Sequence, residues 1–189
     1  NWQSDPNHFE VEANGLTPPN LLESAIARTL APGAYTVIVR GKDQTAGIGL
    51  VEAYDVSPLS GNSKLGNLST RGSVGTGDNV LISGFIVGDV GSSTVVVRAL
   101  GPSLASHGVS GVLSDPQLTI YDSSGSAIAS NNNWQDNNNA IDVQKNGLAP
   151  SNALESALVL HLPAGSYTAV VTGADGGTGN ALVEVYQLD

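Results

Sequence analysis

The chain has 189 residues, with 7 lysines and arginines against 17 aspartates and glutamates, a formal net charge of −10 and an isoelectric point near 4.4. This charge disfavours nucleic acid and anionic lipid as partners, because both require a basic surface. The absence of cysteine excludes disulfides and thiolate chemistry, and no apolar run approaches the ~18 residues that a membrane helix needs. We therefore expect neither a nucleic acid partner nor insertion into a membrane.

A long repeat organises the chain from its first residue. Residues 1–57 align without a gap with residues 133–189, at an offset of 132, and almost half of the aligned positions are identical. A fixed period indicates tandem modules. We therefore predict a full repeat at 58–189, with a front half at 58–132 and a back half at 133–189. Residues 1–57 are then the back half of a preceding repeat.

A solitary back half at 1–57 raises the question of what completes it. Half of a β-sandwich exposes apolar faces and unpaired strand edges, which is costly. The sequence leaves three sources of completion open: a segment upstream, a neighbouring subunit, or residues 58–132 of the same chain. Since the chain begins with Asn1 rather than methionine, we expect it to be processed or part of something longer.

Strand signals dominate the predicted elements. β-Branched and apolar runs alternate with Gly, Pro, Asn and Ser turn signals roughly every 8–15 residues. We predict about nine strands per period and an all-β fold, an antiparallel β-sandwich or jelly roll. Single helical turns are expected at 101–105 and 150–155, and a module junction near 57–63. The clearest strand runs are 35–40, 49–54, 79–87, 93–98, 117–121, 127–129, 167–172 and 181–186.

Several motifs follow one another in a recognisable order. They are Arg98-Ala-Leu-Gly-Pro-Ser-Leu104, Asp115-Pro-Gln-Leu-Thr-Ile-Tyr-Asp122, Leu162-Pro-Ala-Gly-Ser-Tyr-Thr168 and Ala181-Leu-Val-Glu-Val-Tyr186. Together they resemble a tandem β-sandwich repeat of long secreted or surface-anchored bacterial proteins, and their core is similar to bacterial pre-peptidase C-terminal domains. The resemblance implies a non-catalytic module at the bacterial cell surface or in the extracellular space, used for adhesion, spacing or assembly. Some pre-peptidase C-terminal domains bind calcium through carboxylates near strand ends.

Acidic residues near predicted strand ends are candidate calcium ligands. Asp115, Asp122 and Asp136 lie there, the last within the Asn-rich loop 131–139, and carboxylate and amide oxygens suit Ca²⁺. The alternative is that Asp and Asn occupy these positions because they form Asx turns. No other cofactor is expected.

No arrangement of residues predicts catalysis. The three histidines are isolated, and no Gly-x-Ser-x-Gly nucleophile motif is present. A glycosidase would need two carboxylates across a cleft, whereas Glu52 and Glu184 occupy the same repeat position within predicted strands. We expect such a glutamate to pair with an arginine such as Arg98, or to lie at a strand margin. The chain is therefore predicted not to be an enzyme.

The remaining candidate residues are aromatic or potentially glycosylated. Trp2 and Trp134 either close the end of a core or stack on sugars. Tyr35 and Tyr167 begin strands after Gly-containing turns, and we expect a structural role for them. Asn67 lies in an N-glycosylation sequon.

Two functions are compatible with these observations. The first is a structural or adhesive extracellular protein whose modules associate head to tail. Residues 1–57 would then be completed by strand addition from another subunit, and a contact of this kind forms a filament when it does not close. The second is an accessory module of a secreted enzyme that binds carbohydrate or protein.

Overall fold

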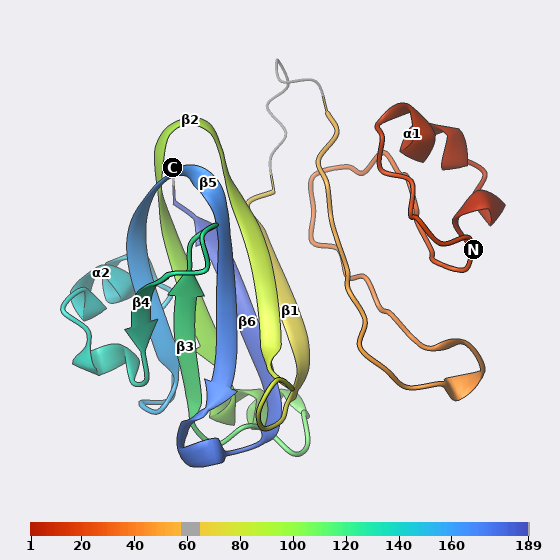
Figure 1. Cartoon of the computed structure of the whole chain (residues 1–189). Helices are drawn as coiled ribbons and strands as arrows, with labels where there is room; N and C mark the ends of the chain where they lie inside the picture. Colours follow the sequence, from red (N-terminus) through yellow and green to blue (C-terminus); the bar gives the residue numbers. More distant parts are fainter. Residues whose placement is uncertain (58–64, 189) are drawn as a thin grey trace. The chain divides into compact units, whose positions relative to one another are not determined.

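The computed structural model describes residues 1–57 and 65–188, and it divides the chain into two compact units, 1–64 and 65–189 (Figure 1). The predicted junction near 57–63 lies almost entirely outside the described residues. Within the described ranges, none of the helices has the length and apolar character that crossing a bilayer requires.

The second unit is a single six-stranded antiparallel sheet with the strand order β1-β6-β2-β5-β3-β4. The prediction of an antiparallel β fold is thus confirmed for this unit, but the predicted sandwich or jelly roll of about nine strands is a single sheet of six strands accompanied by short helices. Strand β1 was missed because its Ser- and Gly-rich sequence resembles a linker. The strands are β1 (Asn67–Val74), β2 (Leu81–Leu100), β3 (Pro116–Tyr121), β4 (Ala127–Asn131), β5 (Ser156–Gly173) and β6 (Gly179–Gln187).

Two strands, β2 and β5, are longer than predicted. Strand β2 replaces the two strands predicted at 79–87 and 93–98, and β5 extends the strand predicted at 167–172 back to Ser156. The β2–β5 register shifts between Val87 and Ser92, where Gly91 adopts a φ of 87°, and Ser92 pairs with Pro163. The expected turn at Pro163–Gly165 is therefore an irregularity inside a continuous ladder. A bulge of this kind bends a strand without ending it.

The main core draws on both halves of these long strands. Residues before the bulge, such as Leu81, and after it, such as Val97, belong to one buried cluster with Leu118 and Ile120 of β3 and Val183 of β6. A continuous sheet that contributes both of its ends to one core must curve around that core, as the crossing ribbons in Figure 1 show.

The opposite face of β5 carries a second, smaller core. Leu158 and Leu162 point into the main core, whereas Ala157 and Val159 face Trp134 and Val143, as the period of two requires. The covering segment contains η4 (Trp134–Asp136) and α2 (Ala140–Lys145). The sequence analysis missed α2 and placed a helical turn at 150–155, where the chain forms only bends and turns. The helical turn expected at 101–105 is present as η3 (Pro102–His107).

The first unit holds the short helices η1 (Trp2–Ser4), α1 (His8–Ala13) and η2 (Lys42–Gln44), and no strand among its described residues. The strands predicted at 35–40 and 49–54 are therefore absent as ladder members. Ladder hydrogen bonds require a partner strand, and the described part of this unit offers none. The apolar side chains of these runs are exposed, among them Val37, Ile38, Val39, Leu50, Val51 and Tyr54.

Candidate functional site

The short helices and several turn hydrogen bonds of 1–57 repeat those of 133–189, although the strands do not. Helices η1, α1 and η2 correspond to η4, α2 and η5 (Ala174–Gly176) at an offset of 132. Asp43 and Asp175 share the rare positive φ, at 53° and 52°. The matching hydrogen bonds are Trp2 N to Glu23 O (2.7 Å) and Trp134 N to Glu155 O (2.8 Å), Asn7 Nδ2 to Ala27 O (3.1 Å) and Asn139 Nδ2 to Val159 O (2.6 Å), and Tyr35 Oη to Ala31 O (2.7 Å) and Tyr167 Oη to Pro163 O (2.9 Å).

In the second unit, the carboxylate of Glu155 joins the back half to the front half. Glu155 is fully buried, and its Oε1 accepts hydrogen bonds from Gly101 N (3.0 Å), Ser103 N (2.9 Å) and Ser103 Oγ (2.6 Å). These three atoms belong to the segment that enters η3. We call Glu155, Gly101 and Ser103 the Glu155 socket. Only glycine fits at 101, because a Cβ there would lie 2.1 Å from the carbonyl oxygen of Leu113.

A second junction between the halves is built around Arg98 on β2. The guanidinium donates to Glu184 Oε2, to the hydroxyl of Tyr186 (3.1 Å) and to the carbonyl of Leu148 (2.9 Å). Tyr186 Oη in turn donates to Glu184 Oε1 at 3.0 Å. We call Arg98, Glu184 and Tyr186 the Arg98 cluster. The ion pair that the sequence analysis considered for Glu184 is thus present in the structure.

Electrostatics and burial hold the Arg98 cluster together. The side chains of Arg98 and Glu184 are only 18% and 10% exposed, and Arg98 stacks over the Tyr186 ring at 5.2 Å. Burial, followed by the charge of Glu184, raises the pKa of the Tyr186 phenol. Because every strong donor and acceptor here is engaged by another side chain or by the backbone, the arrangement joins strands rather than presenting a reactive group.

A third junction lies next to the Glu155 socket. Ser156 Oγ lies 2.6 Å from the carbonyl oxygen of Pro116 and 2.8 Å from that of Asn131, and Ala157 N donates to Asn131 Oδ1 at 3.0 Å. Glu155, Ser156 and Ala157 are therefore one run of the back half that contacts three places in the front half. The sequence analysis did not single them out. Their recurrence as Glu23-Ser24-Ala25 was the signal that could have found them.

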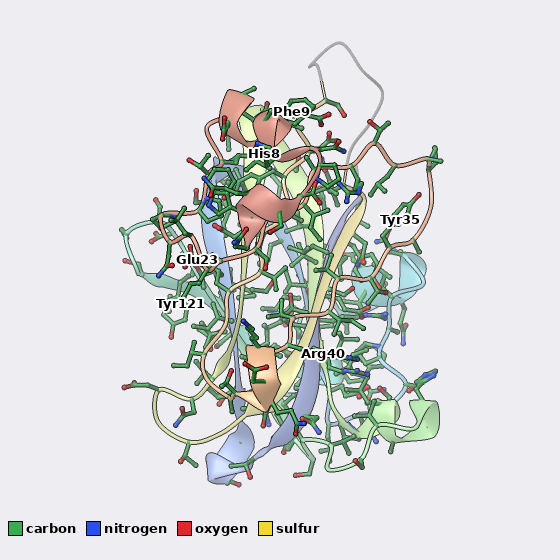
Figure 2. The ribbon with its side chains drawn as sticks, turned by 90° about the vertical axis from the view of Figure 1, so that its right-hand side faces the viewer. His8, Phe9, Glu23, Tyr35, Arg40 and Tyr121 are labelled. Carbon is green, nitrogen blue, oxygen red and sulfur yellow. The ribbon has the colours of Figure 1, made fainter. Side chains whose placement is uncertain are left out.

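The same positions in the first unit lack these front-half partners within the described part of the chain. Among the described residues, the carboxylate of Glu23 accepts a hydrogen bond from Asn20 N at 3.3 Å, and that of Glu52 accepts one from Tyr54 Oη at 3.0 Å. That hydrogen bond raises the pKa of Tyr54. Figure 2 shows Glu23 and Tyr35 among the side chains of this unit, and Tyr35 is 57% exposed where Tyr167 is 8% exposed.

The predicted calcium ligands are not brought together. Among the described residues, no three acidic or histidine side chains gather as a metal site would require. Asp122 Oδ1 accepts hydrogen bonds from Ser124 N (2.9 Å), Ser124 Oγ (2.6 Å) and Ser126 N (3.0 Å), which lower its pKa. Asp136 Oδ2 accepts from Asn133 Nδ2 at 3.0 Å, and burial raises the pKa of Asp115. The contacts of Asp122 are those of an Asx turn.

The other candidate residues have structural contacts. Trp134 and Trp2 are buried, at 5% and 6% exposure. This burial favours the interpretation that they close a core over the interpretation that they stack on sugars. Tyr167 stacks on Phe85 with ring centroids 5.6 Å apart. Asn67 lies exposed at the start of β1, where its Nδ2 donates to Val185 O at 3.3 Å.

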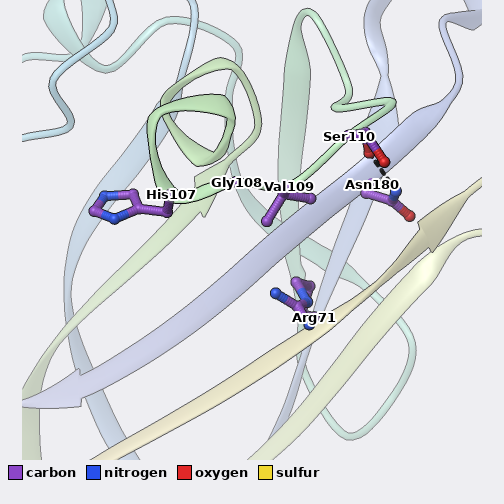
Figure 3. A pocket seen from close by; sticks show the side chains of 6 residues that line it. All are labelled: Arg71, His107, Gly108, Val109, Ser110 and Asn180. Carbon is purple, nitrogen blue, oxygen red and sulfur yellow. Dashed lines mark hydrogen bonds between the residues drawn. The ribbon is translucent and has the colours of Figure 1, made fainter.

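A shallow, open depression of about 350 Å³ lies beside η3 and is lined by Arg71, His107, Gly108, Val109, Ser110 and Asn180 (Figure 3). Asn180 Nδ2 donates to Ser110 O at 2.8 Å and thereby holds the loop to β6. Figure 3 shows the His107 ring on the far side of Gly108 and Val109 from Ser110. No carboxylate lines the depression, so it lacks the paired acid and base that hydrolysis of a glycoside needs.

A scan of protein-family models finds no match to this chain, and a search of curated proteins finds none either. Among solved structures, the chain is similar to the pre-peptidase C-terminal domain of a collagenase from Bacillus anthracis. The match has 16% sequence identity and a TM-score of 0.40, and it covers 63% of this chain and 88% of that one.

Proposed function

We propose that this protein is a non-catalytic structural or adhesive protein of the extracellular space or bacterial cell surface. Its β modules are arranged in tandem, as one full repeat and a preceding back half. The modules associate head to tail, and residues 1–57 are the surface through which they do so. Completion of this unit by strands from another segment or subunit extends the assembly toward a filament.

One observation supports this proposal: residues 1–57 keep the short helices and turns of a back half but form no strand, and the apolar runs that match β5 and β6 are exposed. Apolar side chains that are buried in the second unit are exposed in the first. Val183 is 0% exposed and its counterpart Val51 is 52% exposed, and Leu158 is 3% exposed against 69% for Ile26. Large exposed apolar patches are typical of interaction sites.

The polar groups of the second unit support a structural role as well. Its most buried charged residues, Glu155 and Glu184, are engaged by backbone amides and by Arg98. Such engaged groups specify how strands pair and are not themselves placed as an exposed nucleophile or base.

The test is light-scattering mass together with negative-stain electron microscopy of the 189-residue protein over a range of concentrations. We expect the mass to rise with concentration and elongated particles to appear. A substitution that makes the exposed patch polar, Val51→Ser with Ile26→Ser, should return the protein to a monomer.

The matched control replaces exposed apolar residues of the second unit, Ile82→Ser with Ile86→Ser, which are 54% and 73% exposed. This control should leave the association unchanged. A monomer at every concentration would overturn the proposal, and so would association that the control removes as effectively as the first-unit variant.

A further inference from the structure

We propose that residues 1–57 form a docking surface for one kind of partner, a front-half polypeptide like residues 65–132, and that Glu23 and Glu52 recognise it. The defining feature of this partner is an arginine followed three residues later by Gly-x-Ser, as in Arg98-Ala-Leu-Gly-Pro-Ser103. This inference rests on the proposed function, because it names what completes the first unit.

The first step of the argument concerns Glu23. Its counterpart Glu155 binds three donors of the front half, Gly101 N, Ser103 N and Ser103 Oγ. Glu23 retains the contact to its own turn, Asn20 N to Oε2 at 3.3 Å, which matches Asn152 N to Glu155 Oε2 at 3.4 Å. The carboxylate is therefore oriented as in the complete module, with Oε1 available to the amides of a Gly-x-Ser segment.

The second step concerns Glu52 and Tyr54. They reproduce the contact between Glu184 and Tyr186, with the same 3.0 Å from tyrosine hydroxyl to carboxylate. In the complete module this pair receives Arg98. A guanidinium matches a carboxylate and a neighbouring hydroxyl through its fixed fork of donors, so the incoming segment carries an arginine at this position.

The third step is apolar complementarity. In the second unit the back half buries alternate residues of β5 and β6 against the front half. Their counterparts in 1–57 keep apolar character and are exposed. The pairs, with exposures, are Leu158 (3%) and Ile26 (69%), Leu162 (5%) and Leu30 (57%), Val171 (0%) and Val39 (60%), and Val183 (0%) and Val51 (52%).

The fourth step asks where the front half that completes 1–57 can come from, by comparing the numbers of front and back halves in one chain. Each chain has one front half and two back halves. The front half pairs with residues 133–189 through the β2–β5, β2–β6, β1–β6 and β3–β5 ladders. A second copy could therefore form ladders with 1–57 only by releasing its own back half, so association of the 189-residue chain through the exposed apolar patch leaves 1–57 without ladder partners. The partner is thus a front half that has no back half of its own.

The experiment fuses such a front half to the N-terminus of the chain, at the position that the offset of 132 predicts. A copy of residues 65–132 is placed directly before Asn1 of the full chain, since residue 132 directly precedes the counterpart of Asn1. Hydrogen exchange then reports on the amides of 24–41 and 47–55. We expect these amides to exchange at least ~100-fold more slowly than in the 189-residue chain, and the extended chain to be a monomer by light scattering.

Substitutions of Glu52, Arg98 and Glu23 test whether the two glutamates recognise the partner. In the extended chain, Glu52→Arg should reduce the protection of 47–55 by ~10-fold or more. Arg98→Glu in the added copy should restore it, because the ion pair is reversed rather than lost. Glu23→Ala should reduce the protection of 24–41 by a similar factor. The control Glu12→Arg, at an exposed position on α1, should change neither.

The outcomes separate this inference from the proposed function. If the extended chain stays as unprotected as the 189-residue chain, the front half is not the partner and the docking inference fails, whatever the association of the 189-residue chain shows. If protection appears but the Glu23 and Glu52 variants do not weaken it, recognition by these glutamates is overturned. Equal protection in the 189-residue chain alone would show that a second copy suffices, which contradicts the count of halves.

Discussion

Arg98 on β2 and Glu184 on β6 are direct ladder partners, and the guanidinium of one donates to the carboxylate of the other. The pair thus joins residues 65–132 to residues 133–188 both through the backbone and through a charge. Its counterpart in the first unit consists of Glu52 alone. This asymmetry between two copies of one sequence allows each contact in the complete module to be tested against a matched position that lacks it.

We predict that Arg98→Met lowers the free energy of unfolding of the second unit by about 2–4 kcal/mol. The substitution leaves Glu184 largely buried without its cation, and an uncompensated buried charge is strongly destabilising. Urea denaturation monitors the loss. The double variant Arg98→Met with Glu184→Leu should recover at least half of the lost free energy of unfolding, since apolar replacement of both partners removes the unpaired buried carboxylate. A double variant that is less stable than Arg98→Met would contradict this explanation.

We predict that Glu155→Ala costs about 2–3 kcal/mol of the same free energy, because it leaves the buried amides of Gly101 and Ser103 without an acceptor. The matched substitution Glu23→Ala should change stability by less than ~0.5 kcal/mol in the 189-residue chain. Both variants are compared by urea denaturation. Equal effects at the two positions would mean that Glu23 is already engaged by a front half.

Removal of an apolar side chain should also destabilise the second unit much more than the first. Leu158→Ala creates a cavity in the main core and should cost about 2–5 kcal/mol. Ile26→Ala, at the matching exposed position, should cost less than ~0.5 kcal/mol and reduce self-association instead. Thermal denaturation and light scattering of the two variants check this. A large loss of stability from Ile26→Ala would place that side chain in a core of the 189-residue protein.

We predict that Asp115→Asn stabilises the protein at neutral pH. Burial, and to a smaller extent the charge of Asp175, raises the pKa of Asp115 above its ordinary value of 3.8. The folded state therefore binds the proton more tightly than the unfolded state does. The contribution of Asp115 to the free energy of unfolding falls as pH rises from 3.8 through the raised pKa.

The measurement for Asp115 is the difference in unfolding free energy between Asp115→Asn and the parent, taken at pH 7 and near pH 4. The difference should favour the variant at pH 7 and shrink at the lower pH, where a larger fraction of the parent carboxyl is protonated. Asp175→Asn should produce a smaller change in the same direction. A difference that is independent of pH would refute the assignment.

Much of this molecule follows from local sequence patterns. The offset of 132 predicts the matching helices and hydrogen bonds of 1–57 and 133–189, because identical short segments form identical turns. The period of two within 181–186 places Glu184 on the opposite face from Val183, where an arginine partner is expected. Buried Trp134 likewise agrees with its role as a core residue.

Tertiary structure decided what depends on distant partners. Gly88 and Gly91 separate two apolar runs, yet both runs belong to the one strand β2, which pairs with β5 on either side of a shift in register. Residues 35–40 have the composition of a strand, and without a partner they form none. A helical turn was predicted at 150–155, whereas Glu155 instead accepts hydrogen bonds from the distant amides of Gly101 and Ser103. Local patterns determine which way side chains alternate, whereas strand pairing, burial and the engagement of a buried charge require residues that are distant in the sequence.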